Sequence, residues 1–150
     1  MTAPVHLSAG ILLVNPQGQI LLQLRDSDPL IMFPGFWGIT GGGGEDDESP
    51  ETTARRELSE ETGLALRDIT FFKVYYLSED SGEAPREVYI YHAPIDRGVH
   101  ELSVGEGRAL RFFSPEDLAD LPLAYNHAEV LADFLASPAY RSYLPGNNDG

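Results

Sequence analysis

Residues Gly42 to Leu64 read GGGEDDESPETTARRELSEETGL, and the rest of the chain is interpreted around this stretch. Ser49 followed by Pro50 predicts the start of a helix, because Ser is a favoured N-cap residue and Pro is tolerated at the first helical position. Gly63 predicts its end, since Gly readily adopts the left-handed backbone found after many helices. The sequence therefore predicts a helix over residues 50–62, with a loop on each side.

Three glutamates of the predicted helix share one face. Glu57, Glu60 and Glu61 are spaced i, i+3 and i+4, which at 3.6 residues per turn places their side chains together. Carboxylates held this close repel one another, and a hard divalent cation such as Mg²⁺ would offset that repulsion. A solvated acidic helix face is the alternative interpretation of so short a pattern. The glycine run at 41–44, which lets a ligand approach the backbone, favours a metal site that serves phosphoryl chemistry.

The complete spacing separates these alternatives. The chain matches, without a gap, the Nudix box G-x5-E-x7-R-E-U-x-E-E-x-G-U, in which U is a bulky aliphatic residue. The matching positions are Gly42, Glu48, Arg56, Glu57, Leu58, Glu60, Glu61, Gly63 and Leu64. The chain thus resembles the Nudix hydrolases, which hydrolyse a nucleoside diphosphate linked to another moiety. This resemblance implies an α+β fold, an α/β/α sandwich with a mixed sheet, and a catalytic loop-helix-loop at 42–64.

The resemblance also implies roles for the carboxylates of the box. Glu60 and Glu61 are expected to bind Mg²⁺ or Mn²⁺, and the Gly41 carbonyl is a further implied ligand. Glu57 is expected either to bind metal or to deprotonate the attacking water. The metals would bridge phosphate oxygens while activated water attacks one phosphorus in line.

Other positions of the box are interpreted as structural. Gly42 and Gly63 are interpreted as glycines that the backbone conformation requires. Arg56 is expected to pair with Glu48 and hold the loop against the helix. Asp47 departs from the family pattern, because a glycine is usual at the position before Glu48.

Residues outside the box are candidates for contacts with metal or substrate. MutT-like members carry a distal metal-binding glutamate, for which Glu106 is favoured and Glu101 is the rival. Arg25 ends a predicted strand and either contacts substrate phosphate, as in MutT-type enzymes, or lies on the surface. Asn126 either hydrogen-bonds a nucleobase edge, since an amide offers a donor and an acceptor, or forms a helix-capping pair with Glu129.

The remaining sequence reads as one domain over residues 1–150, with the ends at 1–4 and about 143–150 expected to be flexible. Apolar and β-branched runs predict the strands, and the first two are expected to pair as a hairpin across the turn signal Asn15-Pro16-Gln17-Gly18. In the third run, alternation places Phe72, Val74 and Tyr76 on one face. The predicted strands are 5–14, 19–25, 70–78, 87–95 and 108–113, and the further helices begin near 115 and span 127–136.

Composition excludes several partners. The net charge is −14, Lys73 is the single lysine, and the nine arginines are scattered, so no footprint for a nucleic-acid duplex or an anionic membrane exists. The absence of cysteine excludes disulfides and a thiol nucleophile. The first residues resemble neither a signal peptide nor a membrane span, so a cytoplasmic location is expected. The expected partner is a small nucleotide, bound by a monomer or a homodimer.

The implied reaction is hydrolysis of a phosphoanhydride bond in a nucleoside diphosphate derivative, with Mg²⁺ or Mn²⁺ as cofactor. The favoured substrate is an unmodified or oxidised nucleoside triphosphate. The proline that marks the ADP-ribose branch of the family is missing, because Asp80 occupies its position. The tyrosine that marks some diadenosine polyphosphate hydrolases is also missing, because Ser81 occupies its position. A nucleotide-sugar or ADP-ribose pyrophosphatase remains an alternative, and so does a Nudix-fold module that senses a nucleotide without hydrolysing it.

Overall fold

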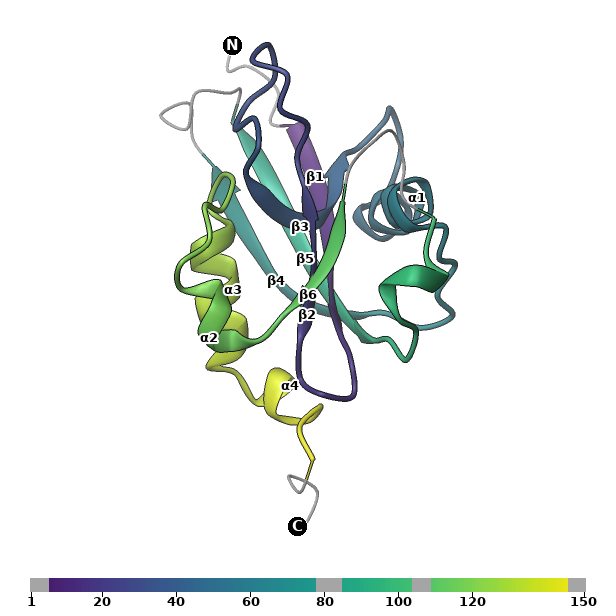
Figure 1. Ribbon diagram of the computed structural model, residues 1–150. Helices are drawn as coiled ribbons and strands as arrows, with labels where there is room; N and C mark the ends of the chain where they lie inside the picture. The colour runs from purple at the N-terminus through teal and green to yellow at the C-terminus, as the bar shows by residue number, and fades with distance from the viewer. Residues whose placement is uncertain (1–5, 78–84, 104–108, 146–150) are drawn as a thin grey trace.

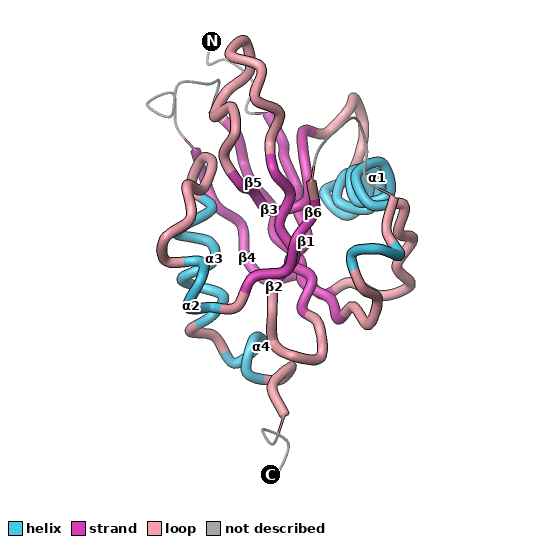
Figure 2. Tube along the Cα trace, viewed as in Figure 1, coloured by secondary structure: helices cyan, strands magenta, loops and turns pink. Residues whose placement is uncertain are grey.

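The computed structural model describes residues 6–77, 85–103 and 109–145, whose elements form three layers (Figure 1). A six-stranded mixed sheet separates α1 from α2 and α3 (Figures 1 and 2), so the expected α+β class and α/β/α sandwich are confirmed. The strands are β1 (His6–Val14), β2 (Ile20–Leu24), β3 (Trp37–Gly43), β4 (Thr70–Leu77), β5 (Arg86–Pro94) and β6 (Leu110–Phe113). The helices are α1 (Pro50–Thr62), the short 3₁₀ turn η2 (Val99–Glu101), α2 (Pro115–Leu118), α3 (His127–Leu135) and α4 (Pro138–Arg141).

The hairpin predicted from the first two strands forms only at its base. Val14 pairs with Ile20, but β3 then lies between β1 and β2 in the order β4-β5-β1-β3-β2-β6. No strand was predicted for residues 37–43, whose glycines hide the alternation of a strand. At Gly41 the glycine is required by close approach, because a Cβ there would lie 2.3 Å from the Ala9 carbonyl oxygen of β1.

Strand β1 supplies apolar side chains to both faces of the sheet. Ile11 and Leu13 pack toward α1, while Leu12 and Val14 pack toward α3, and none of the four is more than 1% exposed. Burying each such side chain contributes about 1.5–3 kcal/mol, so this central strand fixes both helical layers against the sheet. Ala54 and Leu58 of the box helix, and Leu64 after it, are buried on the α1 side.

The alternation predicted for the third run is wrong because of a β-bulge. The register of β4 against β5 shifts between Phe71 and Lys73, which inserts one residue. Phe72 and Tyr75 therefore both pack toward α3, and Val74 is left 44% exposed on the opposite face.

The termini expected to be flexible fall largely outside the described residues, which omit 1–5 and 146–150. Tyr143 is an exception, because its hydroxyl lies 2.5 Å from His92 Nδ1. Helix α4 was not predicted, although Ser137 and Pro138 repeat the Ser-Pro signal of α1, and it brings the chain to this contact. In the described part of the chain, no helix is long and apolar enough to cross a membrane.

Candidate active site

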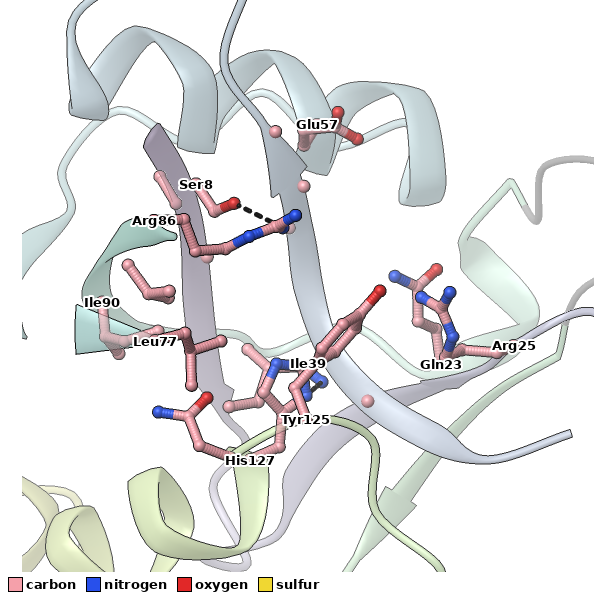
Figure 3. Close-up of a pocket in the computed structure, with 18 of the residues that line it drawn as sticks. Ser8, Gln23, Arg25, Ile39, Glu57, Leu77, Arg86, Ile90, Tyr125 and His127 are labelled. Carbon is pink, nitrogen blue, oxygen red and sulfur yellow. Dashed lines mark hydrogen bonds between the residues drawn. The ribbon is translucent and has the colours of Figure 1, made fainter. Parts of the chain in front are cut away.

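A cavity of about 300 Å³ lies beside β1 and β3, where the C-terminal half of α1 and the segment preceding α3 meet the sheet (Figure 3). In Figure 3, Glu57 lies at one end of it and Tyr125 and His127 lie at the other. Glu61, one helical turn after Glu57, and Asn126, between Tyr125 and His127, also line the cavity. The cavity therefore joins the box helix to a segment more than 60 residues later in the chain.

The box helix begins and ends as its sequence predicts. Ser49 Oγ accepts a hydrogen bond from Thr52 N at 3.2 Å, and Gly63 is left-handed (φ 78°) and donates to the Ser59 carbonyl at 2.9 Å. Asp47, at the position where the family usually has glycine, is also left-handed at φ 67°. Asp tolerates this conformation better than most residues, which explains how the departure is accommodated.

Arg56 holds the glycine-rich loop against α1, and its expected pair with Glu48 is present. Its Nε and a terminal nitrogen donate to the two oxygens of Glu48 at 2.7 and 3.0 Å, and it also donates to the Gly43 carbonyl at 2.9 Å. The Arg56 guanidinium lowers the pKa of Glu48 to about 2. Glu48 in turn raises the pKa of Arg56, so this pair stays charged at any ordinary pH.

The three glutamates of the helix face are not equivalent in the structure. Glu61 is buried, and its Oε1 accepts from Gly41 N at 2.9 Å. Glu57 lines the same cavity and packs against Gly42, where a Cβ would come within 2.5 Å of its carboxylate. Glu60 instead pairs with Arg56 at 3.1 Å and keeps 55% of its side chain exposed. The structure thus brings Glu57 and Glu61 to the cavity and leaves Glu60 at its edge.

The oxygen donors at this end fit a magnesium or manganese ion. Mg²⁺ is commonly held by one or two carboxylates, with water and substrate phosphate completing its shell. Glu57, Glu61 and the backbone of Gly41 supply such a set, although no group of three acidic or imidazole side chains converges in the part of the chain that is described. Glu106 lies outside the described residues. Its rival Glu101 accepts from Gly98 N at 3.0 Å within η2 and is not among the residues lining the cavity.

Asn126 lines the same cavity, between Tyr125 and His127. It occupies the N-cap position of α3, but its side chain makes no capping hydrogen bond, so the capping alternative is wrong for the side chain. Its Oδ1 is buried and accepts no hydrogen bond from the residues that the structure describes. A buried acceptor left unpaired by the fold needs an explanation, and a ligand in the cavity supplies one.

His127 fastens this end of the cavity to β3. Its Nδ1 accepts a hydrogen bond from Ile39 N at 3.1 Å, and Trp37 exchanges two backbone hydrogen bonds of 2.9 Å with residues 122–124. Burial, reinforced by the charge of Arg25, lowers the pKa of His127 to about 4. The imidazole is therefore neutral at pH 7 and able to act as an acceptor. No motif in the sequence indicated this role.

Two arginines flank one aromatic ring in the cavity. Arg25 donates from Nε to the Met32 carbonyl at 2.9 Å, and its guanidinium carbon lies 5.2 Å from the centre of the Tyr125 ring. Arg86 donates to Ser8 Oγ at 3.1 Å, and its guanidinium carbon lies 5.9 Å from the same ring (Figure 3). Arg25 had been predicted as a candidate, whereas Arg86 and Tyr125 had not, because only the fold brings them to the cavity.

Tyr125 also has an unusual backbone conformation. Its φ is 51°, and that of Phe33 in the loop between β2 and β3 is 53°. Their rings are in contact, with centroids 4.7 Å apart. Left-handed backbone is uncommon for bulky residues and costs about 1–3 kcal/mol, and such strain clusters at functional sites.

Comparisons with known proteins identify the family of this chain. The model of the NUDIX domain matches residues 4–134. The chain is 32% identical over 131 residues to the CTP pyrophosphohydrolase of Escherichia coli, covering 86% of this chain and 91% of that protein. It is 28% identical over 130 residues to Nudix hydrolase 25 of Arabidopsis thaliana, covering 81% of this chain but only 65% of that protein. The solved structure of a MutT NUDIX hydrolase from Burkholderia pseudomallei, 30% identical, superposes with a TM-score of 0.69 over 90% of this chain and all of the other. The chain belongs to the Nudix hydrolase family.

Proposed function

We propose that this Nudix hydrolase cleaves a phosphoanhydride bond of a nucleoside triphosphate, unmodified or oxidised, in a reaction that depends on Mg²⁺ or Mn²⁺. The observation that carries the proposal is the cavity itself. Carboxylates that fit a divalent cation line one end, and an amide suited to a base edge lines the other. A nucleotide offers the two complementary parts, a polyphosphate and a base.

The polyphosphate is proposed to lie at the end formed by the box helix. Glu61 and the Gly41 carbonyl would hold the cation, with Glu60 as a further ligand from the exposed edge. The bound cation supplies charge neutralisation at the phosphate oxygens. Glu57 is proposed to take the proton of the attacking water, whose oxygen bonds to phosphorus as the bridging P–O bond breaks. Arg25, whose guanidinium lines the cavity, is proposed to contact phosphate.

The base is proposed to lie against Asn126. Its buried Oδ1 accepts nothing from the described residues, so a ring N–H or an exocyclic amine of the base would satisfy it. Leaving such an acceptor unpaired costs about 1–3 kcal/mol, which gives a suitable base an advantage over one without a donor at that position.

Product release from a panel of nucleotides, with Mg²⁺ and with Mn²⁺, tests the proposal. The panel contains unmodified and oxidised nucleoside triphosphates, nucleotide sugars, ADP-ribose and dinucleoside polyphosphates. Glu61→Gln and Glu57→Gln are each expected to lower turnover by about 10²-fold or more. Glu51→Gln, a change in the first turn of the same helix, is the matched control and should leave turnover unchanged.

Three results would overturn parts of this proposal. Undiminished turnover in Glu61→Gln and Glu60→Gln would remove the metal assignment. Nucleotide binding without turnover of any member would identify a sensing module instead. Asn126→Ala is expected to weaken the preference among bases while leaving cation dependence intact, and an unchanged preference would limit Asn126 to a structural role.

A further inference from the structure

Gln23 of β2 is a buried amide where the apolar core under α1 meets the cavity. Its side chain is only 6% exposed, and it lies on the face of the sheet where Leu21, Ile11 and Leu13 form the core beneath α1. Burying an amide is unfavourable unless it is hydrogen-bonded. The position thus indicates a specific partner rather than core packing.

That partner is the catalytic helix. Gln23 Nε2 donates to Glu61 Oε2 at 2.8 Å, in a buried hydrogen bond between residues 38 positions apart. The other oxygen, Oε1, accepts from Gly41 N at 2.9 Å. The carboxylate is therefore held at both oxygens, from β2 on one side and from β3 on the other, so that its plane cannot rotate freely.

The chemistry of these donors matters for a cation. Both are neutral, so they orient the carboxylate without neutralising it, and each carboxylate oxygen has a second lone pair for another partner. The amide of Gln23 therefore fixes the orientation of the Glu61 carboxylate and leaves the negative charge of that carboxylate in place.

We propose that Gln23 is a positioning residue, which holds Glu61 in the orientation that binds the divalent cation and so sets the affinity for that cation. The inference rests on the proposed function, since it takes Glu61 as a ligand. Groups that hydrogen-bond a metal ligand from behind typically change metal affinity 10–100-fold when removed. Gln23 also lines the cavity, beside Arg25 in Figure 3, so a direct contact with substrate is the competing role.

Cation binding measured without nucleotide separates the two roles. Gln23→Leu and Gln23→Met both remove the donor, and Met keeps the unbranched length in case Leu disturbs the fold. Each is expected to weaken Mn²⁺ binding to the full chain about 10–100-fold in titration calorimetry. Gln17→Leu, in the exposed turn before β2, is the matched control and should bind as the wild type does.

A second readout excludes a merely structural role. Because Glu61 is retained, raising the Mn²⁺ concentration should restore the kcat of Gln23→Met, whereas Glu61→Gln should not recover. Unchanged Mn²⁺ affinity in both Gln23 variants would overturn the inference, and so would a raised KM for nucleotide at saturating Mn²⁺ as the sole defect. Equal Mn²⁺ affinity in wild type and Glu61→Gln would instead overturn the metal site of the proposed function. If the wild type hydrolyses no nucleotide but the Gln23 variants still bind Mn²⁺ more weakly than it does, the role of Gln23 is upheld and the proposed function is not.

Discussion

Lowering the pH is expected to weaken the folded state through His127. The imidazole accepts a hydrogen bond from Ile39 N, and its pKa of about 4 lies well below the value of 6.5 expected in the unfolded chain. Below pH 6.5 the unfolded chain binds a proton that the folded chain does not, so stability falls as pH falls. The loss should begin near pH 6.5 and level off near pH 4.

The magnitude follows from the two pKa values. Each pH unit between them corresponds to about 1.4 kcal/mol, which gives an upper value of about 3 kcal/mol. Because His127 keeps part of its surface exposed, solvent will reduce the effect, and about 2 kcal/mol is the expected size. That is a large share of the 5–15 kcal/mol that stabilises an ordinary domain.

Urea unfolding followed by the fluorescence of Trp37 is the assay. Trp37 is the single tryptophan, and it exchanges hydrogen bonds with the segment that leads to His127. The matched control is His127→Asn, whose Oδ1 replaces Nδ1 as the acceptor but does not titrate. Between pH 7 and 4 the wild type should lose about 2 kcal/mol more than His127→Asn, because the carboxylates contribute equally to both. Parallel losses in the two proteins would refute the reasoning.

Two further predictions concern the backbone around the box. Gly41→Ala should destabilise the fold by about 3 kcal/mol or more in thermal unfolding, because its Cβ would lie 2.3 Å from the backbone of β1 at a φ of 155°. Gly43→Ala is the control, since a Cβ there meets nothing within 4 Å. Ser49→Ala should lose about 1 kcal/mol through the missing N-cap bond, whereas Ser114→Ala, which removes no capping bond to the backbone, should lose less. Equal losses within either pair would contradict these explanations.

The sequence predicted best where the signals are local. Ser49 and Gly63 bound α1 as expected, because capping and left-handed backbone depend on a few adjacent residues. It failed where pairing partners decide the outcome. Strand β3 was missed because its glycines hide the alternation of a strand, and Gly41 is explained only by its close contact with β1. The bulge at Phe72 was missed because it depends on the register against β5.

In the site, too, local spacing was predictive and contacts between distant residues were not. Spacing on the helix identified Glu57 and Glu61, but it did not show that Glu60 turns toward Arg56 instead of the cavity. Gln23 and Arg86 carried no signal at all, since one reads as an ordinary strand residue and the other as the end of a loop. Their roles arise from neighbours 38 and 78 positions away in the sequence.

Strand β3 touches both ends of the cavity with different residues. Trp37 and Ile39 anchor the segment before α3, and Gly41 anchors Glu61. Because these anchors are backbone groups, they persist when side chains in the 122–126 segment are exchanged. Under the proposed function, exchanges in this segment would change which base is admitted and leave the box helix in place. Residues 122–126 are therefore the segment to replace when a variant with another base preference is sought.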